Sequence, residues 1–314
     1  PVACADCHDP ESMELHIPRL FLTEAYTRKG MSIDNVSEQE MRSLVCAQCH
    51  SEYYFSKEDK RVVLPWDNGY SVEDIEAYYD RIGFSDYVHK LSRTPLLKAQ
   101  HPDYELAQMG IHARRGVSCG ECHMPYVGEN QEGYNDHHVQ SPLAMIDRTC
   151  QTCHRETEET LRQDVYDRQT KVTEIREQLE TELAKAHIEA KFAWDRGATE
   201  KQMEQVLKLI RQAQWRWDFC VASHGASFHA PQEVLRVLGT GIDKVMQAQM
   251  DIMKILFKLG YSGDVPIPDV STKEKAQKYI GLDMQTENEA KEAFLKTVIP
   301  QWREEAKANK LLTE

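Results

Sequence analysis

Long hydrophobic runs are missing from this sequence of 314 residues, and none approaches the roughly 20 residues that a membrane-spanning helix needs. Pro-, Gly- or Ser-rich stretches and low-complexity segments are also missing, so no flexible linker marks a domain boundary. Basic residues are not in excess: the net charge of −13 argues against a nucleic-acid partner and favours a partner with a cationic docking surface. These absences leave a globular chain without a spanning segment.

Almost all cysteines of the chain belong to one type of motif. Eight of the nine cysteines lie in four CxxCH motifs, in which two thiols bond a haem and the next histidine binds its iron. The cysteine pairs are Cys4 and Cys7, Cys46 and Cys49, Cys119 and Cys122, and Cys150 and Cys153, and the histidines are His8, His50, His123 and His154. The sequence therefore predicts four covalently attached c-type haems.

Other uses of paired cysteines fit less well. A zinc cluster does not need a histidine after each pair, a thioredoxin motif occurs once, and a disulfide framework rarely uses cysteine only as CxxC. The ninth cysteine, Cys220, lies among Trp and Phe residues, and we expect it to be a small buried side chain.

The absence of a secretory signal sequence conflicts with this haem chemistry. Attachment of c-type haem takes place outside the bacterial cytoplasm, but the chain starts at Pro1, three residues before the first motif. We therefore expect that an N-terminal stretch is missing and that the mature protein is periplasmic or otherwise extracytoplasmic.

Helical periodicity dominates the second half of the chain. Apolar residues recur at helical spacing from about Glu156 to Arg196, a second helix is expected from Thr199 to about Ala222, and a third from Pro231 to Gly260. Shorter helices are expected at Lys273–Ile280 and Glu287–Leu312, with a kink at Pro300. The predicted class is mainly α, with a haem-packed core in residues 1–155 and long helices in 156–314.

The apolar stripe of the first long helix allows two interpretations. Residues such as Val172 and Leu179 could pack in the core of this chain or against a second subunit, and the pattern does not decide between them.

Nine further histidines are available as second axial ligands of the haem irons. The favoured places are His112, the pair His137 and His138, and the pair His224 and His229, while His16, His89 and His187 are background. Met246, Met250 and Met253 are better explained by packing.

Several segments resemble the cytochrome c nitrite reductases, pentahaem enzymes that reduce nitrite to ammonium. They span nearly the whole chain in order: CAQCHSEYYF (46–55), LLKAQHPDYE (96–105), GIHARRGVSCGECHMP (110–125), NDHHVQSP (135–142), AQWRWDF (213–219), SHGASFHAP (223–231) and IPQWREEAKANKLL (299–312). The resemblance implies a multihaem fold, haem c and calcium as cofactors, and nitrite as the substrate.

The resemblance also implies roles for single residues. Tyr53 and His101 match the active-site Tyr and His of the family, while Glu52 and Gln100 match side-chain ligands of calcium. Tyr53 and Lys98 match positions that give backbone carbonyls to the same ion. Carboxylate, amide and carbonyl oxygens are the ligands that calcium prefers.

Three histidines match distal ligands of the family. His137 is assigned to the haem at Cys4 and Cys7, His112 to the haem at Cys46 and Cys49, and His229 to the haem at Cys150 and Cys153. The haem at Cys119 and Cys122 is then the one whose distal histidine is expected upstream.

One feature of the family is not found. Its catalytic haem is attached by a CxxCK motif, and the sequence contains none. We expect this motif, a fifth haem and the active-site Arg of the family upstream of Pro1, and negligible nitrite reduction by this exact chain. The resemblance further implies a homodimer and a membrane-bound or soluble multihaem cytochrome as electron donor.

Two other functions stay open at this point. The chain could be a pure electron-transfer cytochrome in which every iron is six-coordinate, or a related multihaem oxidoreductase acting on hydroxylamine or sulfur oxyanions.

Overall fold

The computed structural model describes residues 2–128 and 133–309 and is mainly helical, as the sequence predicts. Its contacts divide the chain into two compact units, Pro1–Ser262 and Gly263–Glu314, which are described separately. No helix in the described ranges is long and apolar enough to cross a membrane.

Short helices, turns and hairpins make up the part of the first unit that contains the four CxxCH motifs. The helices are α1 (Leu20–Arg28), α2 (Glu38–Ala47), α3 (Val72–Arg81), α4 (Asp103–Met109), α5 (Ile111–Arg114) and α6 (Cys119–His123), with 3-10 turns η1 (Cys4–Asp6), η2 (Ile33–Asn35), η4 (Pro142–Ala144) and η5 (Cys150–Thr152). The antiparallel pairs are β1 (Tyr54–Phe55) with β2 (Val62–Val63), β3 (Tyr87–Val88) with β4 (Pro95–Leu96), and β5 (Tyr126–Val127) with β6 (Tyr134–Asn135).

A small aromatic core supports the second CxxCH motif. Leu44 of α2 and Tyr26 of α1 are buried together with Trp66 and Tyr104. The rings of Trp66 and Tyr104 are stacked with centroids 5.3 Å apart. This packing joins α1, α2 and α4, so it fixes the segments that carry His50 and His101.

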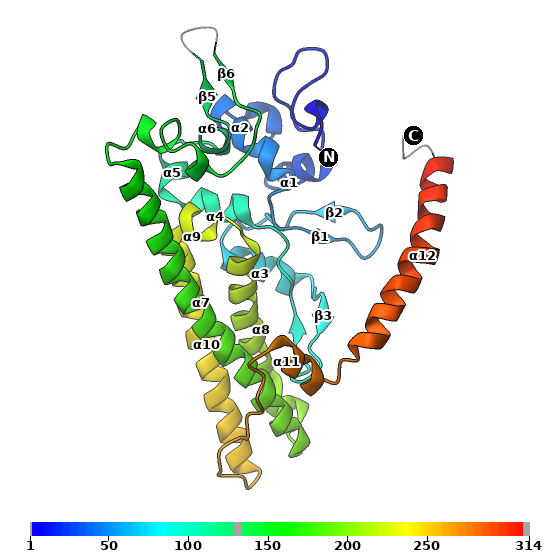
Figure 1. Ribbon diagram of the computed structural model, residues 1–314. Helices are drawn as coiled ribbons and strands as arrows, with labels where there is room; N and C mark the ends of the chain where they lie inside the picture. The colour runs from blue at the N-terminus through cyan, green and yellow to red at the C-terminus, as the bar shows by residue number, and fades with distance from the viewer. Residues whose placement is uncertain (1, 129–132, 310–314) are drawn as a thin grey trace. The chain divides into compact units, whose positions relative to one another are not determined.

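Three long helices form the rest of the first unit: α7 (Glu158–Asp195), α8 (Glu200–Ala222) and α10 (Pro231–Lys258), with the short α9 (Ala226–His229) before α10. They lie side by side as a bundle (Figure 1). The hydroxyl of Thr157 caps α7, and that of Thr199 caps α8. The three long helices predicted from the periodicity are confirmed, and Cys220 is buried as expected.

The apolar stripe of α7 belongs to the core of this bundle. Val165, Val172, Leu179 and Leu183 are all buried within the single chain. Leu179 packs so closely against Gly241 of α10 that a Cβ at Gly241 would lie 2.6 Å from it. Core packing within this chain therefore explains the burial of these four side chains, because α7 packs against α8 and α10.

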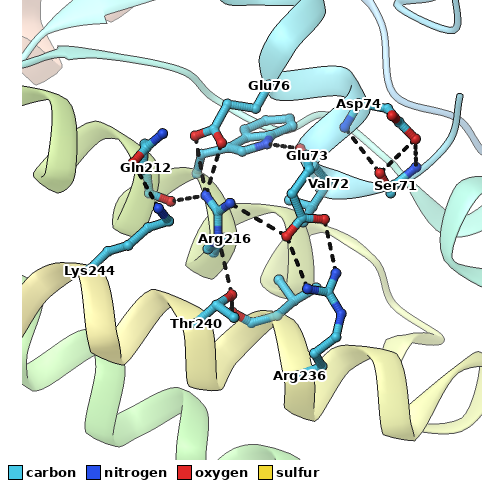
Figure 2. A network of polar contacts seen from close by, with 12 residues as sticks. Ser71, Val72, Glu73, Asp74, Glu76, Gln212, Arg216, Arg236, Thr240 and Lys244 are labelled. Carbon is cyan, nitrogen blue, oxygen red and sulfur yellow. Dashed lines mark hydrogen bonds and ion pairs between the residues drawn. The ribbon is translucent and has the colours of Figure 1, made fainter. Parts of the chain in front are cut away.

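A buried network of charges ties α3 to the bundle (Figure 2). The guanidinium of Arg216 on α8 donates to both carboxylate oxygens of Glu76 at 3.2 Å, and it is paired with Glu73 at 3.5 Å. Arg236 of α10 also pairs with Glu73. Since a buried charge is tolerated only when it is paired, this network fixes how α3 lies against α8 and α10.

The second unit contains α11 (Lys273–Tyr279) and α12 (Met284–Ala308). Pro300 lies inside α12, which continues through it without ending. The expected helix end at Leu312 lies outside the described residues.

Candidate haem-binding and catalytic site

Each CxxCH motif folds as a single helical turn. The backbone N–H of the motif histidine donates to the carbonyl of the first cysteine at 2.8–2.9 Å in the motifs of His8, His50 and His154, and the third motif in chain order forms α6. Residues three positions apart lie on one face of such a turn. The local fold therefore directs the two thiols and the imidazole of a motif toward the same haem, and all eight thiols are free.

Three of the motif histidines lie opposite a second histidine. The ring centroids are 6.1 Å apart for His8 and His137, 6.2 Å for His123 and His229, and 6.3 Å for His112 and His154. Two imidazoles on opposite sides of one metal ion, with metal–nitrogen bonds of about 2 Å, have centroids about 6 Å apart. The three pairs have the spacing that a bis-histidine iron requires.

Hydrogen bonds define which ring nitrogen is available in three of these imidazoles. Nδ1 lies 2.7 Å from the Met13 carbonyl in His8, 2.8 Å from the Asn135 carbonyl in His137, and 2.9 Å from the Gln140 carbonyl in His123. A carbonyl oxygen only accepts, so Nδ1 carries the proton and Nε2 keeps its lone pair. Such bonds typically orient metal-binding histidines. The residues present thus fit haem iron.

The pairing of two distal histidines differs from the expectation. The family resemblance assigns His112 to the haem at Cys46 and Cys49, but His112 lies opposite His154. It assigns His229 to the haem of His154, but His229 lies opposite His123. Motif order along the chain cannot reveal this pairing, because α9, which carries His229, folds back toward α4 and α5.

His50 is the motif histidine without a partner at iron spacing in residues 2–128 and 133–309. Its ring centroid lies 4.4 Å from that of His101, which is too close for two ligands of one iron. The described residues therefore supply no distal ligand for the haem at Cys46 and Cys49. The expectation had placed this missing ligand at the haem of Cys119 and Cys122.

Asp103 organises the cluster around His101. Its Oδ2 lies 3.0 Å from Nε2 of His101 and 3.5 Å from Nδ1 of His50, and the three residues form a group that could hold a metal ion. Oδ1 accepts from the Ser223 hydroxyl at 2.5 Å and from the Gly225 N–H at 3.1 Å. Burial opposes the charge of Asp103, but bonds from His50, Ser223 and Gly225 outweigh it and lower its pKa.

His101 itself is held between acceptors. Its Nδ1 donates to the Cys49 carbonyl at 3.1 Å, and its Nε2 faces both Asp103 and Nδ1 of His224, each at 3.0 Å. The carbonyl of Cys49 lies at one ring nitrogen and the carboxylate of Asp103 at the other, so both nitrogens contact groups that accept a hydrogen bond. The segment before α4 thus holds this imidazole in a fixed orientation.

A cavity of about 360 Å³ lies beside this cluster. Tyr53, Cys49 and Arg19 are among the residues that line it. Because His101 contacts the carbonyl of Cys49, both expected catalytic residues belong to the same neighbourhood. The cavity is large enough for a small anion and several water molecules.

Three of the expected calcium ligands come together next to this cavity. Glu52 is fully buried, and its Oε2 accepts from the backbone N–H of Gln100 at 2.7 Å. The Gln100 side-chain amide donates to the carbonyl of Lys98 at 3.1 Å. Oε1 of Glu52 accepts from the Tyr79 hydroxyl at 2.9 Å. The fourth residue, Tyr53, follows Glu52 directly in the chain.

The environment of Glu52 fits a cation. Burial raises the pKa of this carboxyl well above its ordinary value, and the phenol and amide that contact it carry no positive charge. A buried carboxylate is stable when it is paired or binds a metal, and the oxygen groups gathered here are those that calcium selects. The residues present fit a calcium ion held by Glu52, Gln100 and the Lys98 carbonyl.

Several residues that shape the site were not found by sequence reasoning. They are Asp103, Tyr79, Glu105 and Asp218, and each contacts residues distant in the chain. Only Asp103 had a local signal, as an acid two positions after His101.

The motifs, the histidine pairs and the helical fold together define a multihaem c-type cytochrome. The sequence matches the family model of cytochrome c552 over residues 1–310, and the chain belongs to this family. Haem c is accordingly its cofactor.

Known relatives support this assignment over the whole chain. It is 67% identical over 314 residues to cytochrome c-552 of Parabacteroides distasonis, 62% over 312 residues to that of Porphyromonas gingivalis, and 45% over 337 residues to that of Haemophilus influenzae. These alignments cover 100%, 99% and 100% of this chain, but only 64%, 63% and 63% of the relatives. The chain thus spans slightly less than two thirds of their length.

A solved structure has the same fold. The catalytic subunit of cytochrome c nitrite reductase from Desulfovibrio desulfuricans, which has two calcium sites, matches with a TM-score of 0.76 and 35% identity. The match covers 84% of this chain and 60% of that one.

Proposed function

We propose that this chain is part of a cytochrome c nitrite reductase, which reduces nitrite to ammonium and water with six electrons and eight protons. The observation that carries the proposal is the contact of His101 with the carbonyl of Cys49, a residue that lines a cavity together with Tyr53. Similarity to a nitrite reductase at 35% identity supports it.

The reaction needs an anion-binding cavity and proton donors. His101 can meet both needs, because an imidazole can donate a hydrogen bond to nitrite and can deliver a proton as the N–O bonds break. Asp103 holds the ring in place through Nε2, and Ser223 with the Gly225 N–H holds Asp103. The Tyr53 hydroxyl is the second donor of a hydrogen bond or proton. Haem c, when bound, supplies the electrons.

Calcium would serve this site without reacting. Held by Glu52, Gln100 and the carbonyls of Tyr53 and Lys98, it would join the segment after the second CxxCH motif to the segment before α4. Those segments carry Tyr53 and His101, so the ion would fix their positions and add positive potential.

The remaining histidine pairs would serve electron delivery. His8 with His137, His112 with His154, and His123 with His229 would each hold one iron and leave no position open, so these haems would transfer electrons without binding substrate. We infer that electrons come from a separate multihaem cytochrome, membrane-bound or soluble, and that the protein works in the periplasm.

The homodimer that the resemblance implies needs exposed apolar surface, and most of the stripe of α7 is already buried within this chain. One face of α10 exposes Met246, Met250, Met253 and Phe257, at successive spacings of one helical turn. Exposed apolar side chains in a row mark an interaction surface. We propose that this stripe, together with the exposed Tyr166 of α7, packs against a second copy.

Electron transfer without catalysis is the second candidate. The three histidine pairs favour it, because they describe closed irons. This candidate does not explain why Tyr53 lines a cavity and why His101 contacts Cys49, another lining residue.

The test is an assay of the complete, haem-loaded protein with a chemical reductant and nitrite. We expect six electrons consumed and one ammonium formed per nitrite, without release of intermediates. A protein that is reduced and reoxidised by partner cytochromes but leaves nitrite unchanged would support the second candidate.

A further inference from the structure

Asp218, a buried residue of α8, holds the segment that carries three residues of the candidate site. Only 3% of it is exposed, and its Oδ2 accepts from the backbone N–H of Ala99 at 2.8 Å. Its Oδ1 accepts from the ammonium of Lys98 at 2.6 Å. We propose that Asp218 is a positioning residue of the calcium site, a role that rests on the proposed binding of calcium by Glu52, Gln100 and the Lys98 carbonyl.

The geometry of one peptide unit gives Asp218 this role. The carbonyl of Lys98 and the N–H of Ala99 belong to the same planar group, and no cis peptide bond occurs in the described residues. In a trans peptide the C=O and the N–H point in opposite directions. By binding the N–H, Asp218 turns the Lys98 carbonyl away from α8, and this carbonyl is the one that contacts the Gln100 side chain.

The next peptide is held in the same way from the other side. The N–H of Gln100 donates to Oε2 of Glu52 at 2.7 Å. Two consecutive N–H groups are thus bound by carboxylates from α8 and from the segment before β1. This double attachment fixes the orientation of both flanking carbonyls, so the oxygen ligands are arranged before an ion arrives.

Lys98 makes a carboxylate acceptable at this buried position. An unpaired buried charge would destabilise the fold, but the ammonium of Lys98, whose side chain is half-exposed, neutralises Asp218. Lys98 therefore contributes to the site twice: its carbonyl is an expected ligand, and its side chain is the counter-ion of the residue that orients this carbonyl.

The experiment measures calcium affinity in the complete, haem-loaded protein after removal of calcium by a chelator, using calorimetric titration with calcium alone. Asp218→Ala should raise the dissociation constant by about 10- to 100-fold, as losses of outer-shell partners do. Asp218→Asn should stay within about threefold of the wild type, because its amide oxygen can still accept from Ala99.

Two further variants separate the positioning role of Asp218 from a general effect on the stability of the fold. Glu76→Ala removes another buried carboxylate, bound to Arg216 and not to a ligand peptide, and should lower the melting temperature without changing calcium affinity. If Asp218→Ala does not fold, the double variant Lys98→Met with Asp218→Leu removes both charges together and should show the same loss of affinity.

Each remaining outcome is decisive. Wild-type calcium affinity in Asp218→Ala or in the double variant would overturn the positioning role of Asp218 but not the calcium site. An equal loss of affinity in Glu76→Ala would also overturn it, since general destabilisation would then explain the effect. A wild-type protein that binds no calcium would overturn the site itself and the role of Asp218 with it.

Discussion

Replacing His229 with alanine should remove one axial ligand from the haem attached at Cys119 and Cys122. The two rings of the pair, those of His229 and His123, have centroids 6.2 Å apart, the spacing of two ligands on one iron. His229 is mostly buried, and burial lowers its pKa, so its imidazole is neutral and ready to bind metal. One of three pairs would be broken, so the low-spin signal of the three pairs should fall by about one third.

A double-variant cycle turns this loss into a test of the pairing. His123→Ala should remove the same third of the low-spin signal, whether its iron becomes five-coordinate or its haem is not attached. The variant with both His123 and His229 replaced should lose no more than either single variant, because both act on one haem. The variant with both His154 and His229 replaced should lose about two thirds of the low-spin signal, because these residues act on two different haems.

The assay is magnetic circular dichroism or electron paramagnetic resonance of the oxidised protein, with haem content measured in parallel. If His154 and His229 together cost only one third of the signal, they would share a haem, and the pairing of His229 with His123 would be refuted. His112 gives the matched control, because its loss should be non-additive with His154 and additive with His229.

Other predictions concern catalysis, calcium, assembly and pH. Tyr53→Phe should slow nitrite reduction less than loss of His101 if the hydroxyl only orients substrate, and equal losses would make it the proton donor. Glu52→Ala should abolish calcium binding measured by titration, and unchanged calcium content would exclude the site. Met250→Glu should give monomers in sedimentation experiments, because Met250 is exposed on the proposed interface. Val172→Asp should instead unfold the chain, because Val172 is buried. A Met250→Glu variant that stays dimeric would exclude the stripe of α10 as the interface. Burial raises the pKa of Glu105 to about 8, so the folded chain keeps a proton that the unfolded chain releases above about pH 4.5. Stability should therefore fall as pH rises from about 4.5 to 8, and Glu105→Gln should flatten this decline in thermal unfolding curves.

The sequence predicted those features that depend on neighbouring residues. CxxCH fixes two thiols and an imidazole within one helical turn, so the attachment sites could be named residue by residue. The helices α7, α8 and α10 followed from apolar spacing and from the caps Thr157 and Thr199, which are also local.

Features that depend on how distant segments meet could not be predicted. The partner of His229 is decided by the path of the chain through α8 and α9, which the family resemblance does not reveal. The role of Val172 was open because an apolar stripe looks the same whether α10 or a second subunit covers it. Asp218 lies 119 positions after Ala99, and a lone acid in a helix gives no signal of such a contact.

The most direct test of the proposed catalytic site is nitrite turnover by the His101→Asn variant of the complete protein, with its haem spectra recorded alongside. General acid catalysis typically contributes ~10²–10⁴ in rate, so turnover should fall by that amount while the spectra of the bis-histidine haems stay unchanged. Loss of a six-coordinate haem signal with unchanged turnover would show that His101 is an axial ligand, and it would contradict the catalytic role proposed for this site.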